Sequence, residues 1–327
     1  MIMLEKLNRL AQACLSRYEV SPRATATLIN YTENSTYRVD DPVSGNRFIF
    51  RIYRLGYHDR QAIESELGWM CALRRDAGVQ TAETVPARDG TTLLLLSDDA
   101  LPEPRFGAMF TFLDGTEPPE DHLADSFGRL GEVAARMHHH SRSWALPSGF
   151  KRPTWNFENM LGGPRPIWGR WQDGIGLDPE REKLLGRLME VVARRLERFG
   201  SEREQFGLVH ADLRLANLLV EGDQTKVIDF DDCGFGWYLY DLSTALTFME
   251  ERSDAPELVD SWVRSYRRLA PLTREAEAEI PTFLMLRRMM VVAWIGSHSD
   301  TELARSEGAG YTLGTCRLAS RYLDRFA

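Results

Sequence analysis

Residues 208–232 read LVHADLRLANLLVEGDQTKVIDFDD, and this stretch decides the fold. It contains the pattern H-x-D-x-x-x-x-N, formed by His210, Asp212 and Asn217. Two short apolar runs follow, separated by a turn rich in Gly and Asp, and the second run ends at Asp229. Such runs around such a turn predict a β-hairpin. The hairpin would bring Asn217, at the start of one strand, and Asp229, at the end of the other, toward one site.

The side chains of this stretch are those that phosphoryl transfer requires. One carboxylate must orient or deprotonate the accepting hydroxyl, and hard oxygen ligands must hold the magnesium ion that neutralises the triphosphate. Acidic residues also gather at turns for solubility alone, and a single H-x-D-x-x-x-x-N match can arise by chance. The match followed by a hairpin and an aspartate is much rarer. The stretch therefore predicts a kinase-type active site that uses ATP and Mg²⁺.

The stretch resembles the aminoglycoside phosphotransferase and choline kinase-like branch of the protein-kinase-like fold. Within that branch it is most similar to homoserine-kinase-type and stress-response-kinase-type members. The resemblance implies that Asp212 is the catalytic base, that His210 braces its loop, and that Asn217 and Asp229 bind magnesium. The block that ends at Asp241 also fits, and there the resemblance implies a buried aspartate that braces the catalytic loop.

The resemblance runs from about Thr32 to Asp241 and implies an α+β, bilobal architecture. We expect an N-lobe in residues 1–113, with a five-stranded antiparallel sheet and a helix. A mostly helical C-lobe is expected in residues 114–327, with the nucleotide in the cleft between the lobes. At 327 residues the chain is long enough for such a unit.

No lysine lies between Lys6 and Lys151, so the N-lobe lacks the usual strand lysine for the nucleotide phosphates. Residues 48–54 form an apolar run with the alternation of a strand, which places Ile49 and Arg51 on one face. The resemblance implies that Ile49 covers the adenine and that Arg51 replaces the lysine. Arg54 is the alternative, with Arg51 then a solvated strand residue.

An amphipathic helix is expected over residues 58–76, with Gly78 as its C-terminal stop. The resemblance implies that Glu66 pairs with the strand cation, and Glu64 is the rival. Residues 29–39 read as strand, polar turn and strand, without a glycine-rich loop. By resemblance, the turn binds the phosphates through three further residues, Asn34, Ser35 and Thr36.

Two strands are expected at residues 93–96 and 109–113. The resemblance makes the second of them the hinge between the lobes, where the backbone at Thr111 and Leu113 contacts the adenine. After Asp241 the sequence predicts helices over residues 242–251, 257–269, 274–295 and 303–326. The resemblance implies that contacts with the acceptor come from these helices and from the loop after the catalytic hairpin. The candidates there are Trp237, Glu250, Glu251 and Asp254, although acidic residues at helix ends are more often simply solvated.

Two other segments need an interpretation. Residues 150–178 are rich in Gly, Pro and Trp, so they cannot form one regular element, and their tryptophans favour packing over a substrate wall. The run His138–His140 follows an apolar helical stripe. Consecutive side chains on a helix point in different directions, so the run predicts a helix end rather than a metal site.

Composition limits the remaining classes. A net charge of −8 without a basic stripe argues against a nucleic-acid partner. The four cysteines are widely spaced, as in a cytoplasmic protein with reduced thiols. The first twenty residues are amphipathic and carry charges throughout, which excludes a signal peptide or membrane span for them; they would cover a neighbour or the small lobe. The sequence predicts no oligomeric state and does not distinguish ATP from GTP.

Three functions compete. The leading one is a kinase that phosphorylates a hydroxyl of a small molecule, such as an amino alcohol, a homoserine-like metabolite or an aminoglycoside. The second is a Ser/Thr protein kinase of the stress-response type. Only eleven residues lie between Asp229 and Asp241, too few for a long activation loop, which favours small acceptors. The third is a nucleotide-binding pseudokinase, motivated by the missing lysine. The intact set of Asp212, Asn217 and Asp229 argues against it.

Overall fold

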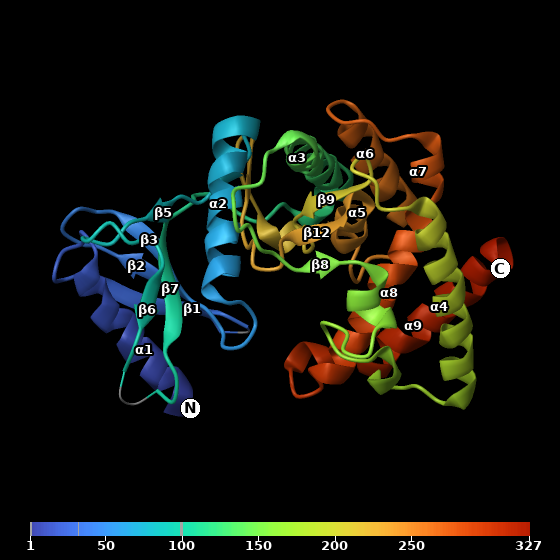
Figure 1. Ribbon diagram of the computed structural model, residues 1–327, viewed down its shortest axis with the longest axis horizontal. Helices are drawn as coiled ribbons and strands as arrows, with labels where there is room; N and C mark the ends of the chain where they lie inside the picture. Colours follow the sequence, from blue (N-terminus) through green and yellow to red (C-terminus); the bar gives the residue numbers. More distant parts are fainter. Residues whose placement is uncertain (1, 32, 99–100) are drawn as a thin grey trace. The chain divides into compact units, whose positions relative to one another are not determined.

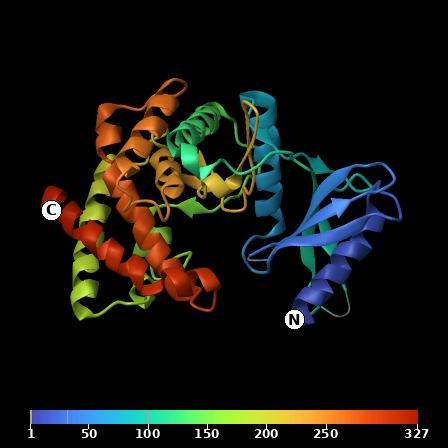
Figure 2. The same cartoon turned by 180° about the vertical axis from the view of Figure 1, so that it is seen from behind.

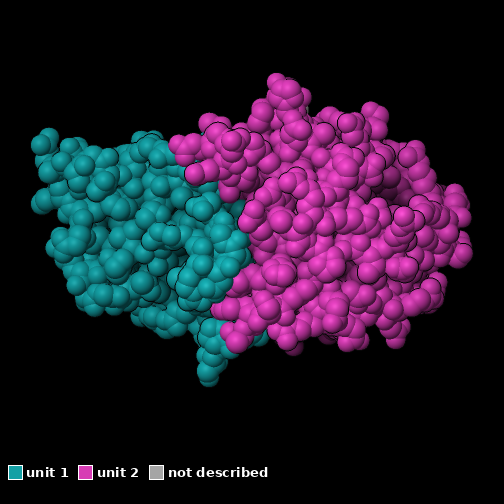
Figure 3. Space-filling view, turned by 90° about the horizontal axis from the view of Figure 1, so that it is seen from above, with its two compact units in different colours: residues 1–115, 146–151, 226–231 teal, residues 116–145, 152–225, 232–327 magenta. Residues whose placement is uncertain are grey.

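The computed structural model describes residues 2–31, 33–98 and 101–327, and its chain divides into two compact units. Unit 1 contains residues 1–115, 146–151 and 226–231. Unit 2 contains residues 116–145, 152–225 and 232–327 (Figure 3). Each unit is therefore built from segments that are not contiguous in sequence. The sequence-based lobes of residues 1–113 and 114–327 remain a prediction.

Unit 1 contains an antiparallel sheet in the order β1-β2-β3-β7-β5, with β6 also paired to β7 (Figure 1). The prediction of five strands was wrong by one. The additional strand is β5, whose two residues precede Pro86 and are too few to leave an alternating pattern. The strands are β1 (Thr25–Tyr31), β2 (Ser35–Asp40), β3 (Arg47–Ile52), β5 (Thr84–Val85), β6 (Leu94–Leu96) and β7 (Arg105–Thr111).

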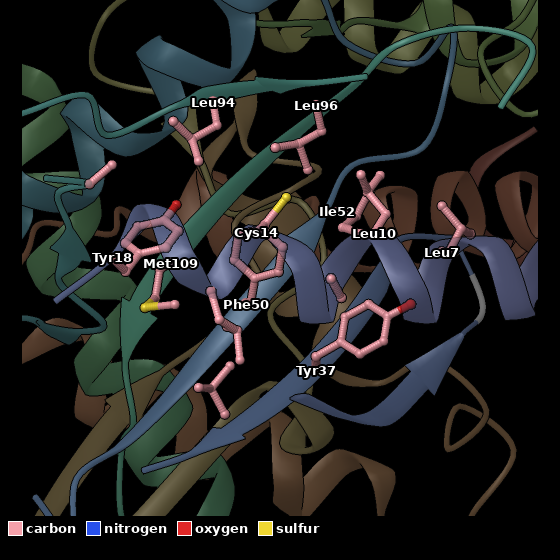
Figure 4. Close-up of a cluster of buried hydrophobic side chains, with 14 of the residues drawn as sticks. Leu7, Leu10, Cys14, Tyr18, Tyr37, Phe50, Ile52, Leu94, Leu96 and Met109 are labelled. Carbon is pink, nitrogen blue, oxygen red and sulfur yellow. The ribbon is translucent and has the colours of Figure 1, made fainter. Parts of the chain in front are cut away.

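Helix α1 (Ile2–Cys14) covers one face of this sheet. Its buried side chains Leu7 and Leu10 belong to the same hydrophobic cluster as Tyr37 and Phe50 of the strands (Figure 4). The amphipathic N-terminal segment thus packs on the small sheet, one of the two roles its pattern allowed. Burial of this apolar face, at about 25 cal/mol per Å², is what holds a short helix in place.

Helix α2 (Arg60–Ala77) begins where the Asp59 side chain accepts a hydrogen bond from the Ala62 N–H at 2.9 Å. It ends at Gly78, whose φ of 63° is the left-handed conformation that glycine adopts readily. Both the predicted helix and its predicted stop are confirmed. The following strand β4 (Gln80–Thr81) pairs in parallel with β11 (Gln224–Val227), the second strand of the predicted hairpin. Its first strand, β10 (Leu218–Glu221), neighbours β11 as expected.

Unit 2 is mostly helical, as predicted, around a small sheet in the order β8-β12-β9. Strands β9 and β12 are antiparallel; β9 ends directly before His210, and β12 leads into α5. Helix α9 is the red helix of Figure 2 and contacts α8 and α4. The strands and helices are β8 (Thr154–Trp155), β9 (Phe206–Val209), β12 (Gly234–Trp237), α3 (Leu123–Ser143), α4 (Pro179–Phe199), α5 (Tyr238–Ala245), α6 (Ala255–Arg267), α7 (Arg274–Ala278), α8 (Ile280–Ser297) and α9 (Glu302–Phe326).

The helix expected over residues 274–295 is two helices, α7 and α8, with a break at Glu279. Pro281, in the first turn of α8, favours a helix start there because a proline lacks the N–H that an internal position needs. Among the residues that the structure describes, one helix, α8, is long and apolar enough to cross a membrane, but 72% of it is buried inside the protein, as in a core helix.

The Gly-, Pro- and Trp-rich segment is irregular, as predicted. It contains β8, a π-helical turn at Glu158–Gly162 and a 3₁₀ turn at Trp171–Asp173. Trp155 and Trp171 are buried in unit 2, so these two tryptophans anchor the segment by packing.

Candidate active site

The loop after β9 is held in unit 2 by the first turn of α5. The Asp241 carboxylate accepts two backbone hydrogen bonds, from the His210 N–H at 3.0 Å and from the Ala211 N–H at 2.8 Å. Ala211 has a φ of 66°, a conformation that costs free energy for a residue with a Cβ and persists where the surroundings impose it. The two bonds to Asp241 are what impose it. The predicted bracing role of Asp241 is confirmed.

The Asp212 carboxylate is surrounded by donors. Asn217 Nδ2 donates to Asp212 Oδ2 at 3.0 Å and to the Asp212 carbonyl at 2.8 Å. Arg214 Nε also donates to Oδ2, at 3.1 Å, and Arg287 Nη2 donates to Oδ1 at 2.9 Å. Because the Asn217 amide nitrogen uses both of its hydrogens in this way, the Asn217 side-chain oxygen is the atom that could bind a cation.

These charges keep Asp212 ionised. Burial by itself raises the pKa of Asp212, but the neighbouring charges of Arg214 and Arg287 lower it overall. His210 is buried, and its Nδ1 accepts a hydrogen bond from the Asp212 N–H at 3.4 Å, which fits the predicted bracing role. An ionised carboxylate can only accept, so Asp212 can receive the hydrogen of a hydroxyl group.

In unit 1, Asp229 follows β11 with a φ of 61°, again strained for a residue with a Cβ. The next residue, Phe230, is buried and packs edge-on against Trp69 of α2 at a centroid distance of 5.7 Å. This contact anchors the segment, while the Asp229 side chain stays 45% exposed. The Asp229 carboxylate is therefore fixed at its base and accessible at its tip, as a ligand for a metal ion must be.

Arg51 of β3 joins Asp229 to α2. Arg51 Nη2 lies 3.0 Å from Asp229 Oδ1, and Arg51 Nη1 lies 3.5 Å from Glu66 Oε1. The rival Glu64 is exposed and pairs with Arg60 on the same helix. The structure thus brings Arg51, Glu66 and Asp229 together; the resemblance had implied the pairing of Arg51 with Glu66.

The other candidate cation, Arg54, has a different set of partners. Its guanidinium lies 2.6 Å from Glu33 Oε2 and 3.5 Å from Asp231 Oδ2, and it stacks on Tyr57. None of these contacts involves Glu66 or Asp229. The geometry therefore favours Arg51 as the phosphate-binding cation.

The predicted phosphate loop lies between β1 and β2, and Thr32, at its beginning, lies outside the described residues. Asn34 and Ser35 are buried, and Asn34 Oδ1 accepts a hydrogen bond from the Arg54 N–H at 2.9 Å. Thr36 is the cross-strand partner of Arg51. The loop is thus tied to the strand that carries the phosphate-binding candidate.

The predicted adenine contacts lie on β3 and β7. Ile49 is half-buried and is the cross-strand partner of Phe110. The Thr111 N–H donates to the Glu83 carbonyl at 2.8 Å, so it is not available to an adenine base unless that bond breaks. Leu113 follows the end of β7 and is half-buried. The roles of Ile49, Thr111 and Leu113 remain predictions, and for Thr111 the contact would have to use the carbonyl.

The acceptor candidates occupy unlike positions in unit 2. Trp237 is buried, and its Nε1 donates to the Gly200 carbonyl at 2.7 Å, which favours packing. The Glu250 carboxylate is 2% exposed and pairs with Arg288 at 3.0 Å, which favours a structural role. Asp254 is accessible and pairs with its neighbour Arg252. The geometry therefore does not support a contact between an acceptor and either Trp237 or Glu250.

The predicted helix end at the histidine run is close to the observed one: α3 continues three residues further, to Ser143, and His140 lies in its last turn. His138 is fully buried, with Nε2 2.9 Å from Asp241 Oδ2 and Nδ1 3.1 Å from Tyr266 Oη. Since a carboxylate only accepts, Nε2 carries the proton and Nδ1 accepts from the tyrosine. His138 thus supports the aspartate that braces the catalytic loop.

Arg214 and Arg287 were not recognised from the sequence. Arg287 lies in an apolar run that was assigned to the core. A signal was present, because two adjacent arginines inside such a run must find partners when the helix is buried. Arg287 and Arg288, the two adjacent arginines, are both buried, and each has an acidic partner.

The residues present fit a magnesium ion by their chemistry. In the part of the chain that the structure describes, no group of three or more His, Cys, Asp or Glu could hold a metal ion. The predicted pair relies instead on one carboxylate, Asp229, and one amide oxygen, Asn217, each held by neighbours in its own unit. Both are hard oxygen ligands, and magnesium bound to a nucleotide usually takes only one or two protein ligands.

Comparison with known proteins agrees with this chemistry. The model of the phosphotransferase enzyme family matches residues 26–278. Amicoumacin kinase of Bacillus subtilis is 23% identical over 257 residues, which cover 73% of this chain and 72% of that protein.

Solved structures are similar over nearly the whole chain. The microcompartment-associated aminopropanol kinase has a TM-score of 0.89 and 42% identity, and the match covers 97% of each chain. An amicoumacin kinase in complex with AMP-PNP, Ca²⁺ and Ami has a TM-score of 0.77 and 21% identity, with 99% of this chain and 96% of that chain covered. The predicted α+β, protein-kinase-like fold is confirmed.

Proposed function

The chain belongs to the phosphotransferase enzyme family, and from that premise we propose that it transfers the γ-phosphoryl group of ATP to the hydroxyl of a small amino alcohol. The observation that carries the reaction type is the ionised Asp212 carboxylate, held by Asn217 and two arginines on a braced loop. The acceptor class is supported by the 42% identity to an aminopropanol kinase over almost the full length of both chains. Neither alternative, a protein kinase or a pseudokinase, has comparable support.

Asp212 accepts the hydrogen of the acceptor hydroxyl and directs its oxygen at the γ-phosphorus. Because its pKa is lowered, Asp212 is a weak base and acts mainly by orientation. That is sufficient for a loose transition state, in which the attacking oxygen forms little bond before the leaving group departs. The P–O bond to the leaving ADP breaks, the new P–O bond forms, and the hydroxyl proton passes to the carboxylate.

The remaining residues hold the nucleotide. Arg51 binds phosphate oxygens and Glu66 orients it, while Asn34, Ser35 and Thr36 cover the phosphates. Asn217 and Asp229 would hold Mg²⁺, which neutralises charge on the triphosphate when it is bound. Ile49, Thr111 and Leu113 contact the adenine. Since a planar guanidinium can bridge two phosphate oxygens, Arg51 can serve without the usual lysine.

The reaction is tested with Asp212→Asn, which keeps the shape of the side chain and removes its charge. We expect turnover to fall by about 10²–10⁴-fold, because positioned acid–base groups contribute that much. The dissociation constant of Mg·ATP should stay within about threefold. The matched control is Asp223→Asn, the same change on an exposed turn, which should leave turnover intact. Turnover of Asp212→Asn within tenfold of wild type contradicts the assignment.

The acceptor is tested by Mg-dependent ADP release with a panel of hydroxyl compounds. The panel contains aminopropanol, ethanolamine, homoserine, an aminoglycoside, a macrolide and a generic protein substrate. We expect the highest kcat/KM with an amino alcohol. A higher kcat/KM with any other compound of the panel would make the class of that compound, and not the amino alcohols, the acceptor class. Release of ADP with the protein substrate alone would support the protein-kinase alternative.

A further inference from the structure

Arg287 of α8 is 3% exposed and connects three parts of unit 2. Its Nε donates to Thr247 Oγ1 at 3.0 Å, its Nη1 to Tyr240 Oη at 3.1 Å, and its Nη2 to Asp212 Oδ1 at 2.9 Å. The guanidinium also lies 5.0 Å from the centroid of the Trp168 ring. A planar guanidinium with each nitrogen in a hydrogen bond cannot rotate, so the position of Nη2 is fixed.

We propose that Arg287 is a positioning residue for phosphoryl transfer, which fixes the orientation of the Asp212 carboxylate toward the acceptor hydroxyl. The inference rests on the proposed function of Asp212 as the group that receives this hydroxyl. It assigns a role in the reaction to a residue of the apolar core helix.

The contacts at Asp212 hold both of its oxygens. Oδ2 accepts from Asn217 at 3.0 Å, and Oδ1 accepts from Arg287 at 2.9 Å. Arg214 Nε lies 3.0 Å from Oδ1 and 3.1 Å from Oδ2. Donors on both oxygens prevent the carboxylate from turning about its Cβ–Cγ bond, and reactions of this kind depend on such alignment.

Stability alone does not explain a buried arginine at this position. Removing two charges from water costs more than most buried ion pairs return, and apolar residues of equal volume are often at least as stable. Arg288, the next residue, is equally buried but pairs with Glu250 at 3.0 Å and donates to the Tyr311 carbonyl, so it has no contact with Asp212. The two adjacent arginines form a matched pair, and only one of them touches the candidate catalytic group.

The test compares Arg287→Gln and Arg287→Lys with the control Arg288→Gln, in the full-length protein with Mg·ATP and the best acceptor. For Arg287→Gln we expect kcat to fall by about 10²-fold, the size of effect that a misplacement of about 1 Å produces. The dissociation constant of Mg·ATP should stay within about threefold. Arg287→Lys should recover part of kcat, because it keeps the charge but not the planar fork. Arg288→Gln should lower the melting temperature with kcat within about threefold of wild type.

A double-mutant cycle separates positioning from general damage to the fold. If Arg287 acts through Asp212, Arg287→Gln should have no further effect on the residual rate of the Asp212→Asn variant. Equal fold-losses in both backgrounds would overturn the inference. If Arg287→Gln does not fold, Arg287→Lys is used for the same cycle.

The two proposals fail in different ways. Full activity in Asp212→Asn would remove the proposed role of Asp212, and this inference with it. An inactive Asp212→Asn beside an Arg287→Gln variant with kcat near wild type would overturn only the role of Arg287.

Discussion

Arg51 shows how a phosphate-binding cation is kept charged in a buried position. Its side chain is 13% exposed and lies between Glu66 and Asp229. Burial by itself lowers the pKa of Arg51, but the neighbouring Asp229, Tyr53 and Glu66 raise it above its usual range. The cation therefore stays protonated throughout the physiological range of pH, and its position is defined before a nucleotide binds.

Replacing Arg51 by alanine should weaken nucleotide binding. A charge-assisted hydrogen bond is worth about 1.5–3 kcal/mol, so we expect the dissociation constant of Mg·ATP to rise by about 10–100-fold. The matched control is Arg54→Ala, which removes the neighbouring arginine and should change that constant by less than about threefold. Isothermal titration calorimetry measures both. The reverse order of the two variants would transfer the phosphate-binding role to Arg54.

Sequence patterns identified the site residues that lie close to one another in the sequence. His210, Asp212 and Asn217 lie within one short loop, so their spacing alone predicted their proximity, and Asp241 followed from the resemblance. Arg287 reaches Asp212 from 75 positions away, on a helix whose apolar pattern indicated only the core. No local rule states which long-range partner a buried arginine will find, and this contact therefore required the structure.

At the scale of elements, His138 connects three helices of unit 2. It lies on α3 and contacts Asp241 of α5 and Tyr266 of α6. Burial lowers the pKa of His138, and the Asp241 carboxylate opposes this shift only in part, while Arg142 adds to it. The ring is therefore neutral in the folded protein at neutral pH.

This lowered pKa predicts a loss of stability in acid. In the unfolded chain His138 is protonated near its ordinary pKa of 6.5, whereas in the folded protein its pKa is lower, so that it is protonated only at a lower pH. The contribution of His138 to stability is therefore present above pH 6.5 and decreases as the pH falls, by up to about 1.4 kcal/mol per pH unit. Between pH 5 and 7, the unfolding free energy measured with urea should depend less steeply on pH for His138→Gln than for wild type. The exposed neighbour serves as control, and His139→Gln should keep the wild-type slope.

Elements were predictable where a pattern was long. Helix α2 was placed within two residues at its start and one at its end, because its apolar stripe is regular and Gly78 stops it. The break between α7 and α8 was missed because the apolar residues continue past it, although Pro281 was a usable signal. Strand β5 has two residues, too few for any period. A long regular pattern thus places an element, but it does not show a break inside that element.

At the scale of the whole molecule, unit 1 depends on residues far along the chain. Strand β11 joins its structure through β4, and Val227 is fully buried there. Phe230 fills a space against Trp69, and Lys226 Nζ donates to the Asp114 carbonyl at 2.7 Å. Residues 1–115 alone lack all three contacts. Unit 1 therefore depends on the segment that also carries Asp229.

A fragment of residues 1–115 should consequently be less stable than the same fragment joined by a flexible linker to residues 224–231. We expect a difference in unfolding free energy of about 3 kcal/mol or more, since removing a buried phenylalanine alone costs about 3–5 kcal/mol. Urea denaturation followed by circular dichroism measures it. Phe230→Ala in the linked fragment is the control and should remove most of the gain. Equal stability of the two fragments would mean that residues 1–115 fold independently. Asp229 would then reach Arg51 without contributing to the fold around it.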